Sequence, residues 1–122
     1  MSKFKVIIAG SRNFSNYKLL EEKCNFYLKN KNDIEIVSGT ALGADYLGEI
    51  YAKNYRYSLK QFKPKWGQYG KSAGYIRNRE MAKYADCLIA FWDSKSKGTK
   101  HMIDLAKKYN LKVRIVKYER RN

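Results

Sequence analysis

The chain alternates between short, continuous apolar runs and longer stretches in which apolar residues recur at every third or fourth position. Continuous runs are typical of strands buried on both faces, and the wider spacing is typical of amphipathic helices. Lys5–Ala9 and Cys87–Trp92 are the most apolar runs, and Tyr17–Leu28 is a clear helical pattern with Ser15 or Asn16 as its cap. The other expected elements are a strand over Ile34–Val37, a helix from about Ala44, a strand over Tyr57–Phe62, a helix over Ala73–Ala85, a helix over Thr99–Asn110 and a strand over Val113–Tyr118.

This alternation of strands and helices predicts an α/β fold: a single Rossmann-like domain over residues 1–122, with a five-stranded, mainly parallel sheet and helices on both faces. The first and fourth strands are the most apolar, so we place them at the centre, with the more polar third and fifth strands outside. The predicted order is therefore 3-2-1-4-5. The direction of winding reverses between strands 1 and 4, where open α/β sheets bind ligands beyond the carboxyl ends of the strands.

Three loops that leave those carboxyl ends are rich in glycine and hydroxyl side chains: Gly10–Phe14, Ser38–Asp45 and Asp93–His101. Glycine allows an anion to approach the backbone closely, and the start of a helix offers free N–H groups to it. None of the loops has the spacing of a Walker A motif or of the GxGxxG dinucleotide fingerprint. Together they predict a phosphate-bearing ligand without naming it.

Several polar residues near these loops have two interpretations each. Arg12 either clamps a phosphate or lies in solvent, and Asp45 either accepts a ribose hydroxyl or stabilises the start of its helix. His101, the one histidine, is a general acid or base or only a hydrogen-bonding ligand. Trp66 and Tyr69 either stack on a base or pack on the next helix. The predicted ligand-binding residues are Gly10, Ser11, Arg12, Ser38, Gly39, Thr40, Gly43, Ala44, Asp45, Lys71, Arg77, Asn78, Asp93, Lys97, Gly98, Thr99 and His101.

The charge distribution adds a second class of partner. The formal net charge is +15, and no acidic residue occurs between Glu49 and Glu80, a stretch that interleaves Lys and Arg with Tyr, Phe and Trp. Cations neutralise phosphates and aromatic rings stack on bases, so the stretch fits single-stranded nucleic acid. A lysine-rich, solvated surface explains the same composition.

Other features of the sequence narrow the class of protein. Cys24 and Cys87 are far apart and without a Cys/His cluster, so we expect two buried thiols and neither a metal site nor a cofactor. The apolar run at the N-terminus ends at Gly10, too early for a signal peptide or a membrane span, and we expect a cytoplasmic protein. We also expect a homo-oligomer, because many small α/β domains complete their sites at symmetric interfaces. The aromatic helix faces offered for that contact carry Tyr17, Tyr27, Tyr51 and Tyr109.

Four stretches in order along the chain carry a resemblance: residues 8–14, 38–45, 73–81 and 91–101. They read IAGSRNF, SGTALGAD, AGYIRNREM and FWDSKSKGTKH. In these stretches the sequence resembles the SLOG superfamily, the Rossmann-like fold shared by LOG-type nucleotide phosphoribohydrolases and the DprA/Smf DNA-processing proteins. More narrowly, it is similar to the small YpsA-related branch found in phages and bacterial mobile elements.

The resemblance implies a nucleotide or a derivative such as ADP-ribose as ligand, with Gly39, Gly43, Gly98 and Thr99 along its phosphate or ribose. Arg77 matches the arginine of the family's R-x-x-x-M helix, which with a glutamate after the Gly-Thr pair serves N-glycosidic cleavage in the LOG-type hydrolases. Here Lys100, His101 and Met102 follow Gly98-Thr99 and the glutamate is missing. A binding protein, acting as a sensor or by sequestering a signal, is therefore the first hypothesis. The alternatives are a nucleotide N-glycosidase, with Arg77 and His101 as catalytic residues, and a single-stranded nucleic-acid binder.

Overall fold

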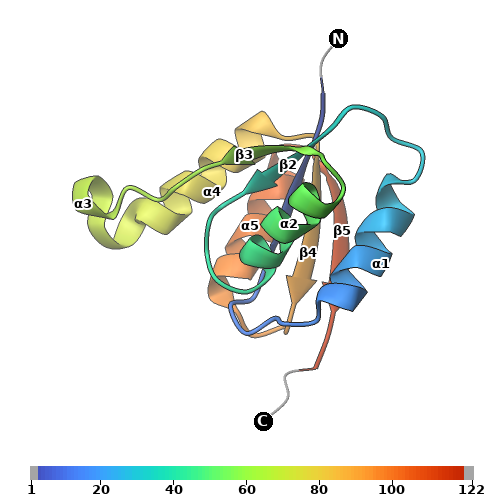
Figure 1. The fold of residues 1–122 in the computed structure, drawn as a ribbon. Helices are drawn as coiled ribbons and strands as arrows, with labels where there is room; N and C mark the ends of the chain where they lie inside the picture. Colours follow the sequence, from blue (N-terminus) through green and yellow to red (C-terminus); the bar gives the residue numbers. More distant parts are fainter. Residues whose placement is uncertain (1–2, 120–122) are drawn as a thin grey trace.

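Five parallel strands form one sheet in the computed structural model, which describes residues 3–119 (Figure 1). The strand order is β3-β2-β1-β4-β5, and every neighbouring pair runs in parallel, so the predicted fold class and order are confirmed. The elements are β1 (Phe4–Gly10), α1 (Tyr17–Leu28), β2 (Ile34–Ser38), α2 (Ala44–Asn54), β3 (Ser58–Gln61), α3 (Trp66–Tyr69), the 3-10 turn η1 (Gly70–Ser72), α4 (Ala73–Tyr84), β4 (Cys87–Trp92), α5 (Lys97–Lys108) and β5 (Lys112–Lys117).

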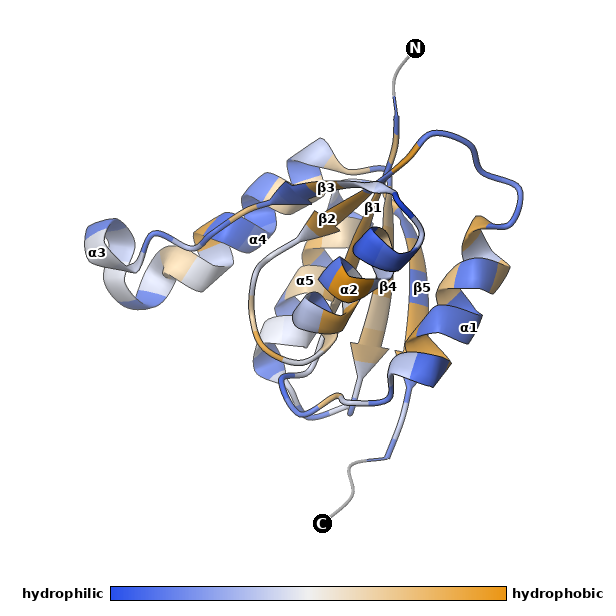
Figure 2. Cartoon of the chain, viewed as in Figure 1, coloured by the Kyte–Doolittle hydropathy of each residue, from blue (hydrophilic) through white to orange (hydrophobic). Residues whose placement is uncertain are grey.

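Each face of the sheet is covered by two helices, because successive strand residues point to opposite sides. Val6 and Ile8 of β1 pack with the apolar sides of α1 and α2. Ile7 and Ala9 pack with α4 and α5 on the other face. The central strands are mostly apolar, whereas the helices turn polar residues outward (Figure 2). The sheet thus brings its carboxyl ends together as a rigid edge between the two layers.

Helix caps decide the two boundaries where the pattern was ambiguous or misleading. The side chain of Asn16, not Ser15, accepts the backbone N–H of Leu19 at 3.0 Å and starts α1. At α5 the hydroxyl of Ser96 accepts the N–H of Thr99, so the helix begins at Lys97, earlier than the predicted start at Thr99. A serine cap preceding a glycine and lysines carries no apolar periodicity, which is why the pattern missed it.

The connection between β3 and α4 stands away from the body of the protein (Figure 1). Here α3 and η1 form two short turns that the sequence did not predict, because neither is long enough to show a periodic pattern. We call residues 63–75, which include the first residues of α4, the projecting arm. Its aromatic side chains Trp66, Tyr69 and Tyr75 are exposed, Trp66 by 52%. The arm therefore offers rings to whatever approaches this side.

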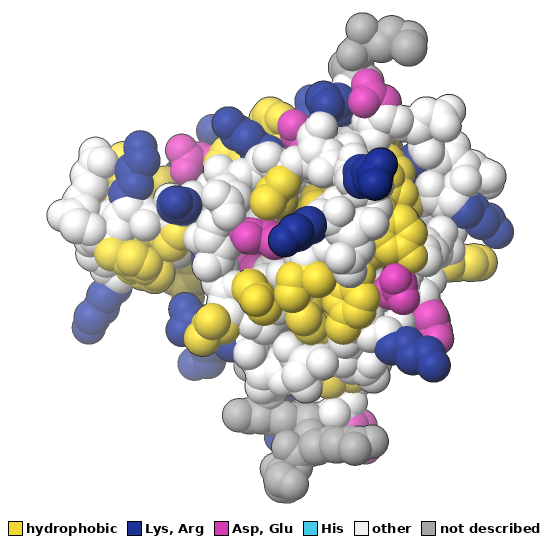
Figure 3. Space-filling model, viewed as in Figure 1, with side chains coloured by type: hydrophobic (Ala, Val, Ile, Leu, Met, Phe, Trp, Pro, Cys, Tyr) yellow, Lys and Arg dark blue, Asp and Glu magenta, His cyan; other side chains and the backbone are white. Residues whose placement is uncertain are grey.

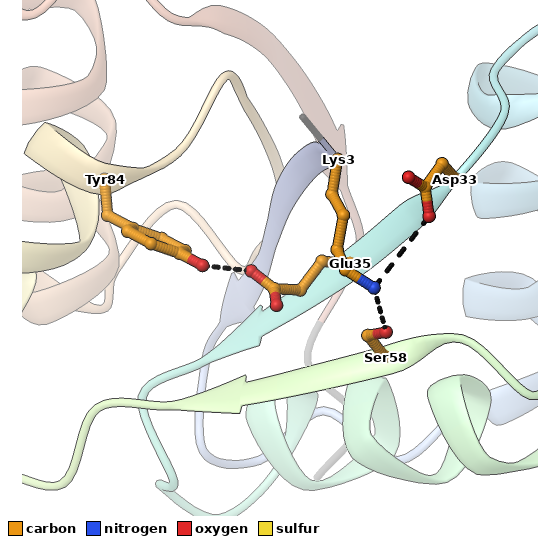
Figure 4. A network of polar contacts seen from close by, with 5 residues as sticks. All are labelled: Lys3, Asp33, Glu35, Ser58 and Tyr84. Carbon is orange, nitrogen blue, oxygen red and sulfur yellow. Dashed lines mark hydrogen bonds and ion pairs between the residues drawn. The ribbon is translucent and has the colours of Figure 1, made fainter. Parts of the chain in front are cut away.

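The amino-terminal ends of the strands are joined by polar contacts (Figure 4). Lys3 donates to Ser58 of β3 at 2.6 Å and lies 3.8 Å from a carboxylate oxygen of Asp33. The hydroxyl of Tyr84, at the end of α4, donates to Glu35 of β2. We call this set the amino edge; it connects β2, β3 and α4 at the end of the sheet remote from the glycine-rich loops.

Two further predictions concern buried side chains: a tyrosine expected in an oligomer contact and the two cysteines. Tyr51, offered as part of an oligomer contact, is fully buried, because its ring packs near Tyr55 and Tyr57 and its hydroxyl donates to Asn25 at 2.7 Å. That expectation is wrong for Tyr51. The thiols of Cys24 and Cys87 are buried and unbridged, as predicted. Within residues 3–119, we find no helix of the length and apolarity needed to traverse a bilayer.

Candidate functional site

The carboxyl ends of β1, β2 and β4 meet at a cavity of about 110 Å³. We call it the inner pocket. Its floor includes Met81 and Met102, which are almost fully buried between α4 and α5. A cavity of this size accommodates a phosphate group and not a whole nucleotide, since pockets for drug-sized ligands measure about 300–1,000 Å³. Its lining residues are Ala9, Gly10, Arg12, Ala41, Asp45, Arg77, Asn78, Met81, Ser96, Gly98, Thr99 and Met102.

Gly39, just after β2, lies between two charged side chains of the pocket region. A Cβ atom at this position would lie 2.8 Å from Oδ2 of Asp45 and 2.9 Å from Nη1 of Arg77. The same Nη1 donates to the carbonyl oxygen of Gly39. Both distances are shorter than a carbon atom tolerates, so the absence of a side chain at Gly39 is what lets the carboxylate and the guanidinium close over the backbone.

Asp45, in the first turn of α2, is 5% exposed and lines the inner pocket. Burial raises the pKa of its carboxyl to about 6, although the N–H of Ala41 at 3.1 Å and the positive charge of Arg77 lower it. Glu49 on the same helix raises the pKa further. The pocket thus holds a carboxyl group that exchanges a proton near neutral pH.

Arg77 extends from α4 toward the carboxyl end of β2. Its Nε donates to Oδ1 of Asn78 at 2.9 Å, and its Nη1 is held by Gly39. Burial lowers the pKa of the guanidinium, and the nearby Arg12 lowers it too, while Asp45 acts in the opposite direction. Within residues 3–119, no carboxylate lies within 4 Å of its nitrogen atoms. This arrangement suits an anion that enters from the pocket.

The loop after β1 is packed against the start of α2 by glycine. At Gly43, where φ is 80°, a Cβ would lie 2.4 Å from the carbonyl oxygen of Ser11 and 2.6 Å from that of Arg12. The N–H of Ala44 then reaches the carbonyl of Ser11 at 3.4 Å. Arg12 itself remains exposed and lines the inner pocket. Gly43 and Ala44 therefore hold the loop after β1 in place and do not line the inner pocket.

The start of α5 forms the opposite wall. The hydroxyl of Ser96 accepts the N–H of Thr99 and lies 2.9 Å from its hydroxyl oxygen. At Gly98 a Cβ would meet nothing within 4 Å, so the wall is open at this point. Lys97 is exposed and lies outside the pocket lining.

Asp93, which follows β4, organises the loop before α5. Burial raises the pKa of its carboxyl, but hydrogen bonds outweigh that effect and lower it: the N–H groups of Lys95 and Ser96 donate at 2.9 and 2.8 Å, with further contributions from Ser11 and Asn13. The hydroxyl of Ser11 accepts the N–H of Asp93 at 3.2 Å. Asp93 and Ser11 thus position the loop and do not line the pocket.

A second cavity, about 360 Å³, opens beside the inner pocket, and we call it the outer pocket. Arg12, Ala41 and Arg77 line both cavities. Leu42 and Trp66 give the outer pocket exposed apolar surface, and Lys63 adds positive charge. No acidic side chain is among its lining residues: Arg12, Gly39, Thr40, Ala41, Leu42, Lys63, Pro64, Trp66 and Arg77.

The predicted ligand-binding residues divide between the pockets and their support. Those in either lining are Gly10, Arg12, Gly39, Thr40, Asp45, Arg77, Asn78, Gly98 and Thr99. Those outside both linings are Ser11, Ser38, Gly43, Ala44, Lys71, Asp93, Lys97 and His101. Ser38 is fully buried and donates to Glu49 at 2.6 Å, Lys71 is exposed in η1, and His101 faces Asn78 at 3.2 Å.

The linings also contain residues that the sequence reasoning did not propose. Ser96 was missed because the start of α5 was placed at Thr99. Ala41 and Leu42 have no polar group to attract attention, yet Ala41 lines both pockets and Leu42 lines the outer pocket. Lys63 and Pro64 come from the projecting arm, whose position no local pattern predicts. Within the described part of the chain, no three His, Cys, Asp or Glu side chains come together as metal ligands would.

Known proteins resemble this chain in sequence and in fold. Residues 4–69 match the family described as YspA, cpYpsA-related SLOG. The Gene 61 protein of Mycobacterium phage D29 is 30% identical over 116 residues, which cover 89% of this chain and 93% of that protein. The X-ray structure of DNA processing protein A (DprA) from Streptococcus pneumoniae superimposes with a TM-score of 0.76 at 21% identity, over 96% of this chain and 51% of that one. The chain therefore spans about half the length of DprA, and at this identity the likeness shows the fold alone.

Proposed function

The chain belongs to the YspA, cpYpsA-related SLOG family, and from that membership and the two pockets we propose that it binds a nucleotide or nucleotide-derived ligand at the carboxyl edge of the sheet. The observation that carries the proposal is the pairing of Asp45 with Arg77 on either side of Gly39. A guanidinium binds phosphate oxygens, and a carboxylate accepts the hydroxyl groups of a ribose.

The sizes of the pockets support a ligand with two chemically different ends. The inner pocket has room for one phosphate, between Arg77 and the start of α5. The outer pocket is about three times as large and is bordered by the ring of Trp66, on which a base can stack. Arg12 and Ala41 lie where the two cavities join, and the ribose would cross there. A mononucleotide, linear or cyclic, fits this description, whereas an ADP-ribose-like molecule would have to place its second ribose outside the inner pocket.

We favour binding over turnover. No glutamate follows Gly98-Thr99, and His101 lies outside both pocket linings, so it is badly placed to move a proton on the ligand. For the N-glycosidase alternative, Asp45 is the better-placed acid, because its pKa is about 6 and it faces the pocket. Given a phage-encoded relative, we place a sensor or a sequestering protein in the host cytoplasm.

The test is binding of AMP, NAD, ADP-ribose and cyclic nucleotides by calorimetry, with mass spectrometry of the mixture afterwards. We expect one compound to bind and to be recovered intact. Arg77→Gln should weaken its binding by about 2 kcal/mol, or roughly thirtyfold, as loss of a hydrogen bond to a charged group does. Arg79→Gln is the matched control, since Arg79 is exposed on the same helix and lines neither pocket.

Three outcomes would change the conclusion. Release of a free base or a ribose phosphate would make the protein an enzyme. Equal losses in Arg77→Gln and Arg79→Gln would show only a general attraction between cations and anions. Failure of every compound to bind would remove the nucleotide proposal and leave nucleic acid as the partner to examine.

The projecting arm supports single-stranded nucleic acid as a second candidate. Trp66, Tyr69 and Tyr75 are exposed there, next to Lys63, Lys65 and Lys71, and the protein similar in fold is named a DNA processing protein. On the face shown in Figure 3, however, Lys and Arg are scattered over the arm, the rim and the middle of the face, and do not gather in one patch. Binding of an oligonucleotide that weakens steeply between about 50 and 200 mM salt would support this candidate. Binding insensitive to salt would exclude it.

A further inference from the structure

A line of three polar side chains leads from the pocket to the outside of the α4–α5 layer. Nε of Arg77 donates to Oδ1 of Asn78 at 2.9 Å, and Nδ2 of Asn78 lies 3.2 Å from Nδ1 of His101. Asn78 is 6% exposed, so both ends of its amide are engaged inside the protein. His101 is half-buried on α5. The line therefore connects a pocket residue to a titratable group that does not touch the pocket.

The donor at Arg77 fixes the orientation of the Asn78 amide and the tautomer of His101. A guanidinium only donates hydrogen bonds, so the amide of Asn78 must turn its oxygen toward Nε. Its NH₂ group then faces His101, and Nδ1 of the imidazole must accept. It follows that His101 is neutral in this arrangement, with its proton on Nε2. The orientation of one side chain and the tautomer of the next both follow from the first donor.

The surroundings of His101 favour the neutral ring. Burial lowers the pKa of the imidazole, and the positive charge of Arg79 on α4 lowers it further, while Asp104 on α5 acts in the opposite direction. The ring of Tyr75, also on α4, lies with its centroid 4.3 Å from that of His101 and adds no charge. These surroundings keep the pKa of the imidazole below its ordinary value, so the ring takes up a proton at a lower pH than a free histidine does.

We propose that His101 is a positioning residue for Arg77: neutral His101 holds the amide of Asn78, which fixes the guanidinium at the pocket, and protonation of Nδ1 releases it. Two N–H groups would face each other after protonation, so Asn78 must abandon one neighbour. If it turns its oxygen to His101, its NH₂ group opposes Nε of Arg77. The guanidinium then loses the contact at Nε and is held at one point, by Gly39, so its plane is less firmly fixed.

The inference rests on the proposed function in one respect, which is that Arg77 holds the anionic end of the ligand. Arg77 would bind an anion most tightly with its plane fixed at two points, since a preorganised donor loses less entropy on binding. Acid then weakens binding through His101. Electrostatics alone predicts the opposite, because a proton on His101 or on Asp45 makes the site more positive. The sign of the pH effect separates the two explanations.

The arrangement is first tested in the free protein. Because the chain has one histidine, its ring nitrogens give unambiguous signals in a ¹⁵N NMR spectrum. We expect an unprotonated Nδ1 and a protonated Nε2 at pH 7. Asn78→Asp should move the proton to Nδ1, because the carboxylate accepts on both sides. In His101→Leu, the Nε–H of Arg77 should exchange faster with solvent. A protonated Nδ1 in the unaltered protein, or unchanged exchange at Arg77, would overturn the proposal.

Binding of sulfate then tests the consequence for the site, because the charge of sulfate is constant between pH 5 and 8. His101→Asn is the conservative variant, since Oδ1 of asparagine accepts where Nδ1 did and does not titrate. We expect its affinity at pH 7.5 to equal that of the unaltered protein, and His101→Leu to bind several-fold more weakly. At pH 5 the unaltered protein should bind more weakly than His101→Asn, also by several-fold.

The comparison with His101→Asn decides between the two explanations, because both proteins carry Asp45. If the unaltered protein binds sulfate more tightly than His101→Asn at pH 5, the charge of the ring dominates and the proposal is wrong. If sulfate binds neither protein at any pH, the proposed function loses support. The NMR results on His101 and Arg77 decide the positioning role in that case as well, so the two failures are distinguishable.

Discussion

The two ends of the sheet treat charged side chains in opposite ways. At the amino edge, Lys3 contacts Asp33 and Ser58, and Tyr84 contacts Glu35, so polar groups satisfy one another across β2, β3 and α4 (Figure 4). At the carboxyl edge, Asp45 and Arg77 are drawn into the protein and held mainly by backbone groups, with no carboxylate–guanidinium contact within 4 Å among residues 3–119. The contacts at the first end stabilise the fold, and the charges at the second end would be available to the ligand that we propose.

Two raised pKa values express the same contrast. The pKa of Tyr84 is raised to about 12, chiefly because its hydroxyl donates to the carboxylate of Glu35. The pKa of Asp45 is raised to about 6, chiefly because burial disfavours its charge. The raised pKa of Tyr84 reflects a hydrogen bond that stabilises the folded protein. The raised pKa of Asp45 reflects the free-energy cost of keeping a buried carboxylate charged at neutral pH. Substitutions at the two ends should therefore change stability in opposite directions.

The largest expected effect is a gain of stability in Asp45→Asn. The folded-state pKa of Asp45 lies above its ordinary value of 3.8, so the folded protein binds this proton more tightly than the unfolded chain does. The stabilisation that comes from binding this proton is complete below about pH 4 and is lost as the pH rises through about 6. At pH 8 the asparagine variant, which mimics the protonated form, should be more stable by about 3 kcal/mol, from 1.36 kcal/mol per pKa unit.

Urea denaturation of both proteins at pH 4 and pH 8 measures this prediction. The difference in unfolding free energy should be large at pH 8 and close to zero at pH 4. The same variant should bind the ligand more weakly, since an amide is a poorer acceptor than a carboxylate. A destabilised Asp45→Asn at pH 8 would mean that the attraction of Arg77 outweighs the burial of the carboxylate.

The second effect concerns binding at the carboxyl edge. Gly39→Val places a Cβ within 3 Å of Asp45 and Arg77, so we expect the carboxylate and the guanidinium to shift away from the backbone that follows β2. Loss of its hydrogen bond to a charged ligand costs about 2 kcal/mol, or roughly thirtyfold in Kd. Gly67→Val is the control, because a Cβ there meets nothing within 4 Å. Equal affinities in calorimetry for the two variants would contradict the assigned role of Gly39.

These examples also show what the sequence could and could not predict. Apolar runs and helical spacing predicted the strand order, because strands buried on both faces are more apolar than the strands at the edges of the sheet. Glycines placed the carboxyl edge correctly, since close approach at Gly39 and Gly43 requires them. Whether a polar side chain faces the pocket or a neighbouring loop depends on rotamers and partners, so Ser38, Asp93 and His101 were grouped with the pocket although they lie outside it. The projecting arm depends on long-range packing and left no periodic signal.

A smaller effect is expected at the amino edge from Tyr84→Phe. The substitution removes a hydrogen bond to a carboxylate that is partly exposed, and it should lower the free energy of unfolding by roughly 1 kcal/mol. Ligand binding should not change, because Tyr84 lies at the other end of the sheet. Tyr109→Phe is matched in chemistry, since Tyr109 is similarly half-buried just after the end of α5, and its effect should be smaller. A loss of binding in Tyr84→Phe would show that the two ends are coupled.

The smallest effect belongs to the pair of Lys3 and Asp33, whose side chains are 42% and 51% exposed. Water and salt screen such a pair, so a double-mutant cycle with Lys3→Met and Asp33→Asn should give a coupling energy of about 0.5 kcal/mol or less. Asparagine is suitable at residue 33 because φ is 52° there, a conformation that Asn tolerates. The coupling should vanish in 1 M salt. A coupling that persists there would mean that the hydrogen bond from Lys3 to Ser58 fixes the amine for Asp33, and the amino edge would then act as one network.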